Sequence, residues 1–88
     1  MLNKLIKEID KKKNPENAKV YARFFKTGKG EYGYGDVFLG LTMSEQRKIA
    51  KEFIDIDFGD IKKILYNEYH EYRMIGFIIL VYKYEMVE

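Results

Sequence analysis

The sequence predicts a small all-α fold of about five helices. Apolar residues recur at helical spacing in several segments, no segment alternates apolar and polar residues with the period of two that strands show, and the connections are short. A chain of 88 residues is long enough for one domain, close to the size at which a single core is marginally sufficient. With 47% hydrophobic and 34% charged residues, its composition is that of a globular chain.

Two helices separated by an Asn-Pro pair are expected at the start of the chain. The first covers residues 2–13, because four apolar residues share one helix face at the i, i+3, i+4, i+7 spacing: Leu2, Leu5, Ile6 and Ile9. Asn14 can cap the next helix and Pro15 fits its first position. The second helix is therefore expected to run from about Pro15 to Lys26.

A glycine-rich segment follows, and two more helices come after it. Residues 27–36 contain four glycines and break any helix. Thr42 and Glu45 form the pattern of a capping box, so a third helix is expected from there to about Ile54. A second cap at Asp57 predicts a short fourth helix that turns its apolar residues inward.

The last helix, about residues 68–86, is apolar nearly all round between Met74 and Tyr82. That pattern is typical of a helix buried on several sides. Gly76 lies within it, although glycine inside a helix costs roughly 1 kcal/mol relative to alanine. We interpret Gly76 as a point of close approach by a neighbouring helix.

Positive charge is concentrated in the first part of the chain. Residues 1–51 hold 12 Lys/Arg and 6 Asp/Glu, a balance of +6, whereas residues 52–88 hold 4 and 8, a balance of −4. A basic surface of this kind suits phosphate binding, because each neutralised phosphate releases counterions. A solvated lysine-rich helix has the same pattern, so charge alone leaves both interpretations open.

Several classes of site and location are disfavoured. The chain has no cysteine, which rules out disulfides and thiolate metal sites. Its start lacks the apolar block and cleavage site of a signal peptide. The longest apolar run, Phe77–Tyr82, is far shorter than the roughly 18 residues that span a bilayer. We therefore expect a soluble, cytoplasmic chain with no membrane partner.

The glycine-rich segment matches the dinucleotide-binding pattern G-x-G-x-x-G at residues 28–33. That chemistry needs a strand before the loop and a helix opening at its third glycine, and neither is predicted here. Gly35 also replaces the valine of the kinase-type loop. We interpret the match as chance. The lysines and tyrosines of the segment can touch a nucleic-acid backbone or simply pack locally, and local packing is the simpler interpretation.

No active site is recognisable in the sequence. A serine triad would need both Ser44 and His70, the only serine and the only histidine. Ser44 lies inside the capping box, and His70 is expected at the start of the last helix. There is no HExxH or EF-hand spacing for a metal ion. We therefore predict no catalytic residue, no metal and no cofactor in this chain.

Specific strings resemble the bacterial and archaeal DNA alkylation repair family. They occur in order from about residue 10 to the end of the chain: NPENA (14–18), ARFFK (22–26), the glycine-rich segment closing on FLG (28–40), EQRKIAK (45–51), and HEYR (70–73) leading into FIILV (77–81). Each string alone is weakly specific, but the ordered set is specific.

The resemblance implies an α-solenoid of HEAT-like helical repeats whose concave, basic face cradles duplex DNA. Glycosylases of the family excise cationic N-alkylated purines, such as 3-methyladenine and 7-methylguanine, by hydrolysing the glycosidic bond. A carboxylate stabilises positive charge on the sugar, tryptophans pack near the lesion, and the base is not fully flipped out as in other glycosylases. The implied role is DNA repair, and the implied partner is duplex DNA with alkylated bases.

Residue by residue, the resemblance gives DNA-binding candidates and no catalytic residue. Phe24 stands where relatives have an aromatic residue that faces the DNA near the lesion. The candidate phosphate contacts are the neighbouring cations Arg23, Lys26, Lys29, Arg47 and Lys48, although Arg23 can equally be a buried structural arginine. Tyr34 and Gly76 depart from the family, in which an acidic residue and an alanine are expected at these positions.

The family's catalytic aspartate, tryptophans and supporting arginine are expected beyond residue 88. Residues 1–88 are thus expected to be a single N-terminal segment without the catalytic part: a fragment, a truncated reading frame or a reduced variant. We expect it to be inactive and to self-associate through Met74 to Tyr82, since solenoids usually need about three repeats and large apolar patches seldom stay exposed. The alternative is a small helical protein-interaction module without DNA function.

Overall fold

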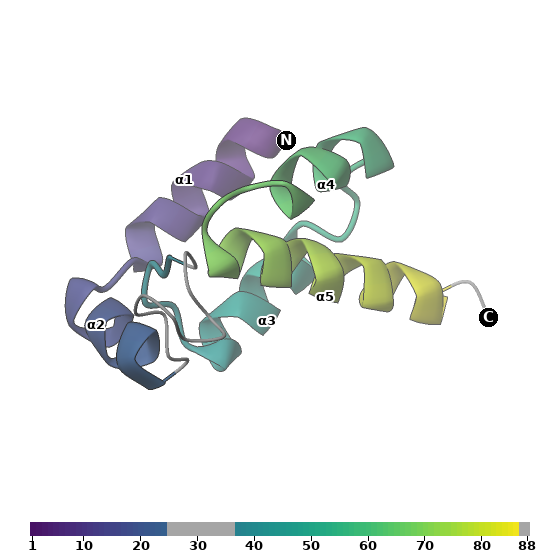
Figure 1. Ribbon diagram of the computed structural model, residues 1–88. Helices are drawn as coiled ribbons and strands as arrows, with labels where there is room; N and C mark the ends of the chain where they lie inside the picture. The colour runs from purple at the N-terminus through teal and green to yellow at the C-terminus, as the bar shows by residue number, and fades with distance from the viewer. Residues whose placement is uncertain (25–36, 87–88) are drawn as a thin grey trace.

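The computed structural model describes residues 1–24 and 37–86, and within them the chain forms five helices (Figure 1). The helices are α1 (Leu2–Lys12), α2 (Pro15–Phe24), α3 (Met43–Glu52), α4 (Phe58–Leu65) and α5 (His70–Met86). The described residues contain no strand, only an isolated bridge between Val37 and Tyr69. The predicted all-α fold is confirmed, and the arrangement is consistent with a helical-repeat fold.

The predicted capping signals start the helices as expected. Thr42 Oγ1 accepts from the Glu45 amide, and a Glu45 carboxylate oxygen accepts from the Thr42 amide, which completes the capping box of α3. Asp57 caps α4 by accepting from the Asp60 amide. Asn14 Oδ1 accepts from the second and third residues of α2. These side chains satisfy amides that the first turn of a helix leaves unpaired.

Some helix ends differ from the prediction, each for a local reason. Helix α3 ends at Glu52, before the expected Ile54, because the backbone of Phe53 leaves the helical region. Helix α5 begins at His70 rather than Glu68. The amide of Tyr69 is bound by the Asn67 side chain, and the amide of His70 is bound by the carbonyl of Val37. The expected last residues of α2, 25 and 26, lie outside the described part of the chain.

The core forms where α5 packs against α3 on one side and α4 on the other, while α1 packs on α3 (Figure 1). Its fully buried apolar side chains come from all four of these helices and from the segments between them: Leu5, Ile9, Leu41, Ala50, Ile56, Ile61, Ile75 and Ile79. Helix α2 has no buried residue. The hydrophobic effect therefore holds four helices together, and α2 needs another anchor.

Gly76 lies where α5 passes closest to α4, as the sequence predicts. A Cβ atom added to Gly76 would stand 3.0 Å from Leu65 Cδ2 and 3.1 Å from Ile64 Cγ1. Both distances are tighter than ordinary van der Waals contact. The missing side chain thus lets two helices approach more closely than alanine would allow.

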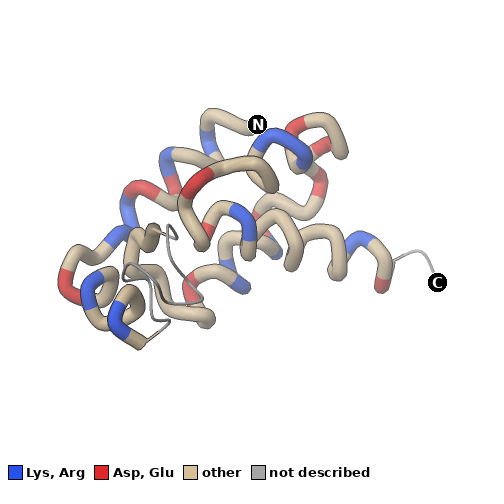
Figure 2. The backbone as a smooth tube through the Cα atoms, viewed as in Figure 1, with Lys and Arg blue, Asp and Glu red and all other residues tan. Residues whose placement is uncertain are grey.

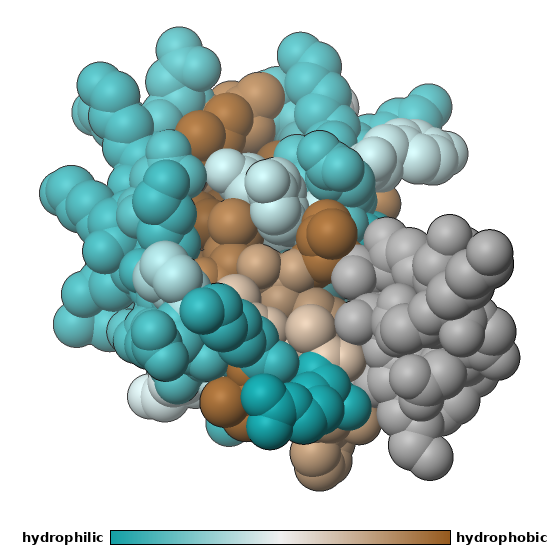
Figure 3. Space-filling view, turned by 60° about the vertical axis from the view of Figure 1, so that its left-hand side comes forward, coloured by the Kyte–Doolittle hydropathy of each residue, from teal (hydrophilic) through white to brown (hydrophobic). Residues whose placement is uncertain are grey.

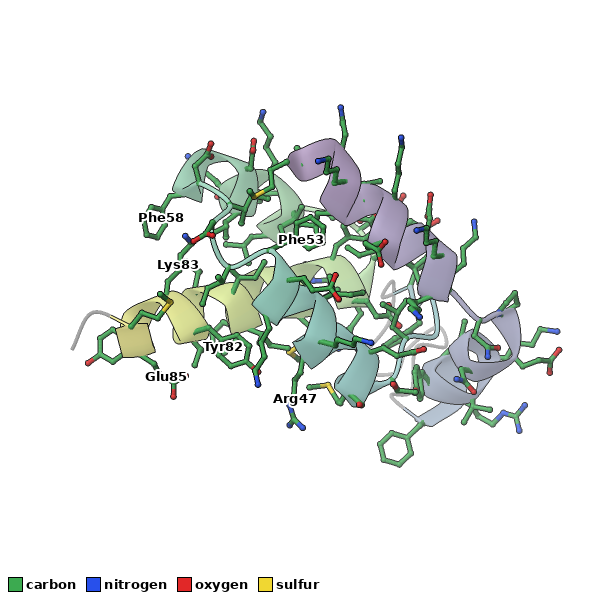
Figure 4. All side chains as sticks on the ribbon, turned by 180° about the vertical axis from the view of Figure 1, so that it is seen from behind. Arg47, Phe53, Phe58, Tyr82, Lys83 and Glu85 are labelled. Atoms are coloured by element: carbon green, nitrogen blue, oxygen red, sulfur yellow. The ribbon has the colours of Figure 1, made fainter. Side chains whose placement is uncertain are left out.

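Helix α5 is buried against both α3 and α4, but one stripe along it stays exposed, so it is not buried all round. Ile75, Ile78 and Ile79 belong to the core, whereas Phe77 and Val81 are 60% and 40% exposed. The helix also extends past its neighbours toward the C-terminus (Figure 1). Near that end, Lys83 Nζ lies 5.4 Å from the centre of the Phe58 ring (Figure 4). The outer face of α5 is therefore apolar and open among the described residues.

Candidate nucleic-acid interface

The segment that enters α3 is anchored by a buried carboxylate. Glu71, the second residue of α5, is fully buried and accepts from three successive amides, those of Leu39, Gly40 and Leu41, at 2.9, 2.8 and 3.3 Å. Hydrogen bonds to a charged acceptor are stronger than neutral ones. A single side chain from α5 therefore fixes the backbone 30 to 32 residues earlier in the chain.

The same segment anchors α2. The amide of Asn14 donates to the Leu39 carbonyl at 2.7 Å, and the Asn17 side chain donates to the Gly40 carbonyl at 3.3 Å. Gly40 has a φ of +94°, and a Cβ atom there would stand 2.0 Å from the Asn14 carbonyl oxygen. Only glycine fits this position. We call this group (Asn14, Asn17, Gly40 and Glu71) the polar junction.

A pocket of about 330 Å³ adjoins the polar junction, and Glu71 belongs to both. Its described lining comes from α2, from the segment entering α3, from α3 and from the start of α5: Val20, Tyr21, Phe24, Phe38, Leu41, Met43, Gln46, His70 and Glu71. The exposed walls, Val20, Phe24 and Met43, leave it open to solvent, with Phe24 the most exposed at 75%. The aromatic residue that the resemblance marks as DNA-facing thus stands at the mouth of an apolar pocket.

Two of the predicted cations border this pocket. Arg23 is exposed, so the interpretation of a buried structural arginine is wrong. It lies about 60° around α2 from Val20, and Arg47 lies about 40° around α3 from Met43, given 100° per residue. In Figure 4, Arg47 projects from α3 away from α1.

Lys48 is also exposed, but it is turned about 140° from Met43 and faces away from the pocket. Lys26 and Lys29 lie outside the described residues. Of the predicted residues in the described part of the chain, only Phe24 lines the pocket. Arg23 and Arg47 lie on the helices that form its walls, and Lys48 faces away from it.

A second group of cations lies on α1. Lys4, Lys7 and Lys11 recur along one exposed side of this helix, and Lys11 pairs with Glu8 at 3.0 Å. Figure 2 shows Lys and Arg repeated along α1 and α2. Figure 3 shows apolar surface left open between hydrophilic side chains on the side of the molecule turned forward there. The predicted positive charge of the first part of the chain is thus spread over more than one face.

A comparison with known protein families identifies the family of this chain. The family model described as DNA alkylation repair enzyme matches residues 5–88. The chain belongs to the DNA alkylation repair enzyme family. No curated protein and no solved structure matches the chain in the same comparisons.

Two residues that the sequence alone did not single out, Gly40 and Glu71, lie in strings that resemble the family. In this DNA alkylation repair chain, Gly40 closes the FLG string and Glu71 belongs to the HEYR string, and the structure joins the two in the polar junction. A carboxylate just before the apolar run from Met74 to Tyr82 is the sequence signal that could have identified Glu71. The pocket had no comparable signal, because its walls come from four separate parts of the chain.

The single histidine of this family member takes part in packing. The rings of His70 and Phe38 lie 4.9 Å apart between centroids, and Phe38 also meets Tyr21 edge-on at 6.2 Å. Ser44 is exposed on the first turn of α3. His70 lines the pocket, whereas Ser44 is not among the residues that line it.

The described residues contain neither a cluster that could hold a metal ion nor a membrane-spanning helix. No group of three or more His, Cys, Asp or Glu residues that could hold a metal ion occurs in residues 1–24 and 37–86. No helix in the same ranges is long and apolar enough to cross a membrane.

Burial raises the pKa of the Tyr72 hydroxyl above its ordinary value of 10.0, and the nearby carboxylate of Asp10 adds to the shift. Tyr72 packs in the core at the α1 side of α5 and contacts Tyr69, with 6.2 Å between ring centroids. Burial and a nearby negative charge both disfavour the phenolate. Tyr72 is therefore a neutral structural residue and lies outside the candidate interface.

Proposed function

We propose that this chain is the N-terminal DNA-binding part of a DNA glycosylase that excises N-alkylated purines. Membership of the DNA alkylation repair enzyme family supports a role in DNA repair. The observation that carries the proposal further is the position of Phe24, which is exposed at the mouth of an apolar pocket whose walls include the helices that carry Arg23 and Arg47. A DNA-binding interface of this kind needs cations that position phosphates and an aromatic ring that contacts a base.

The proposed mechanism is electrostatic and steric. Arg23 and Arg47 contact phosphates of the duplex, and Phe24 packs against the damaged nucleotide. Phenylalanine can stack on a base but has no hydroxyl with which to donate a hydrogen bond. The chain has no tryptophan, so it lacks the residues expected beside the lesion, and we propose that it does not release the base by itself.

Salt-dependent binding to duplex DNA tests this proposal. Each phosphate contact adds a slope of roughly 0.9 to the fall of log affinity with log salt concentration. Arg23→Gln and Arg47→Gln are each expected to lower that slope by about one contact. Lys62→Gln, an exposed cation on α4, is the matched control and should leave it unchanged. Affinity that ignores salt, or an equal effect of all three variants, would contradict the proposal.

Release of the damaged base is tested separately. Free 3-methyladenine or 7-methylguanine would be measured after incubation with methylated duplex DNA. We expect no release above the rate without protein. Sustained release by the purified chain would show that the catalytic group lies within these 88 residues.

A protein-interaction module that self-associates through α5 is the second candidate. Within the expected range Met74 to Tyr82, Phe77 and Val81 are the two exposed residues, and Tyr84, 78% exposed, continues their stripe. The buried residues of that range belong to the core and cannot contact a partner. Sedimentation at high concentration tests this candidate, and Phe77→Ser should abolish any dimer. A monomer at every concentration, with salt-dependent DNA binding, would favour the first candidate.

A further inference from the structure

Two core helices hold the backbone of residues 39–41 in place. Glu71 on α5 accepts hydrogen bonds from all three amides of this stretch. Gln46 on α3 donates from Nε2 to the Leu41 carbonyl at 3.0 Å. Both side chains are buried, and α3 and α5 also pack against each other. Residues 39–41 therefore have a fixed place against the core, to which another helix can be attached.

Helix α2 is attached to this stretch at its N-terminal end. The Asn14 amide donates to the Leu39 carbonyl at 2.7 Å, and the Asn17 side chain donates from Nδ2 to the Gly40 carbonyl at 3.3 Å. Asn14 precedes the helix, and one attachment at the end of a rod leaves its rotation unset. Asn17 is half-buried in the first turn of α2 and supplies a second attachment. Its bond therefore fixes which side of α2 faces the core.

The side of α2 that Asn17 fixes is also the side that carries Phe24. The two residues are seven positions apart, which places them about 20° apart around the helix and about 10 Å apart along it. Between them, the Tyr21 ring meets the Phe38 ring edge-on. An aromatic pair accepts stacked and edge-on arrangements alike, whereas a hydrogen bond weakens steeply when it is bent. The bond of Asn17 is thus the more directional of these two contacts.

We propose that Asn17 is a positioning residue of the DNA interface. Its bond to Gly40 sets the orientation of α2 and thereby presents Phe24 to the duplex. Asn17 acts through the helix rather than by contact with DNA. The orientation of α2 is a property of the free protein, whereas its effect on binding rests on the proposed function.

Asn17→Ala separates this bond from the stability of the helix. The change removes the donor and leaves the net charge unaltered, so it adds no repulsion of phosphates. Alanine is also a stronger helix former than asparagine, so α2 itself is not weakened. The backbone amide of residue 17 still donates to Asn14 Oδ1. Asn3→Ala, the same change at an exposed position of α1, is the matched control.

The orientation of α2 is measured in the protein without DNA. The chain has no cysteine, so a spin label on the exposed position of Lys19→Cys is unique. The label broadens the amide NMR signals of α3 and α5 according to their distance from it. We expect Asn17→Ala to change this pattern while the helical circular dichroism stays the same, and Asn3→Ala to preserve it. An unchanged pattern in Asn17→Ala overturns the inference, whether or not the protein binds DNA.

The effect on DNA is measured by a double-mutant cycle on a duplex with one 7-methylguanine. Phe24→Ala is expected to weaken binding about tenfold, as the loss of one contact between a base and an aromatic ring does. Asn17→Ala acts through Phe24, so the double variant should bind no more weakly than Phe24→Ala alone. Combined with Arg47→Gln on α3, the effect of Asn17→Ala should multiply instead. Multiplied effects in the pair with Phe24 would show a general structural role and overturn the inference.

Together the two measurements separate this inference from the proposed function. If the wild-type protein binds no duplex while Asn17→Ala changes the label pattern, the proposed function fails and the control of α2 by Asn17 is retained. If the wild-type protein binds duplex with the expected salt dependence while the label pattern is unaffected by Asn17→Ala, the proposed function stands and the inference fails.

Discussion

Helices α2 and α4 lie on different parts of the same small fold and are held by different forces. Helix α4 buries Ile61 and Ile64 and packs so closely on α5 that a Cβ atom at position 76 would press against Leu65 and Ile64. Helix α2 buries no residue and is fixed by backbone and amide hydrogen bonds to the segment that ends at Gly40. The helix that carries Arg23 and Phe24 is therefore the one that contributes least to the core.

The way in which each helix is held determines which side chains it can present to a ligand. A helix held by apolar burial turns its hydrophobic stripe inward and leaves mainly polar groups for a ligand. A helix held at one end by hydrogen bonds can expose apolar side chains, and α2 exposes Val20 and Phe24 beside the pocket. Exposed aromatic side chains are costly for folding and useful for binding.

The largest expected effect comes from breaking the polar junction at Gly40. Gly40→Ala forces a side chain into a positive-φ position and to within 2.0 Å of the Asn14 carbonyl oxygen. We expect a loss of about 3 kcal/mol or more in the free energy of unfolding, measured by denaturant titration. Gly59→Ala is the matched control, because its φ is not positive and its added Cβ meets only a side-chain oxygen at 3.3 Å. Equal stability of the two variants would show that α2 is not seated through Gly40.

A smaller effect is expected from the carboxylate of the junction. Glu71→Gln keeps the shape but removes the charge and replaces one acceptor oxygen by a donor that faces backbone amides. We expect a loss of about 2 kcal/mol, together with faster amide exchange at residues 39–41, followed by NMR. Glu68→Gln, an exposed change on the same approach to α5, should leave both unchanged. Unchanged exchange in Glu71→Gln would mean that the three amides are held by something else.

The smallest expected effect concerns the contact between α4 and α5, away from the polar junction. Gly76→Ala gains helix propensity of roughly 1 kcal/mol but pushes against Leu65 and Ile64. We expect a net loss of about 1 kcal/mol, measured by thermal unfolding. Combined with Leu65→Ala, which removes the nearest atom, the same change should cost clearly less, because the two positions are coupled. Strict additivity of the two changes would mean that α4 and α5 adjust freely.

The helices were predictable from the sequence because their signals are local. A capping box, an Asn-Pro restart and apolar spacing all act within a few residues, and α1, α3 and α4 begin where these signals place them. The expected place of His70 at the start of the last helix is confirmed, whereas the approximate bound at residue 68 was two residues early. The exact start depends on a hydrogen bond from the His70 amide to the Val37 carbonyl, which is distant in the sequence.

The candidate site was predictable only in part, for the same physical reason. Phe24, Arg23 and Arg47 followed from the family resemblance, and of these three Phe24 lines the pocket while the arginines are exposed on α2 and α3. The bond from Asn17 to Gly40 and the burial of Glu71 depend on which segments meet in space. Charge pattern alone could not separate Arg47 from Lys48, which are neighbours in sequence and face different directions.

The position of Glu71 also bears on the order in which the chain can fold. Helical turns close over four residues, whereas the carboxylate must reach amides about thirty residues earlier, and such distant closures form late. Helices α3, α4 and α5 can assemble first by burying their own apolar faces. We therefore expect the docking of α2, and with it the pocket beside Phe24, to follow the first turn of α5 and to be the last step in ordering the described residues.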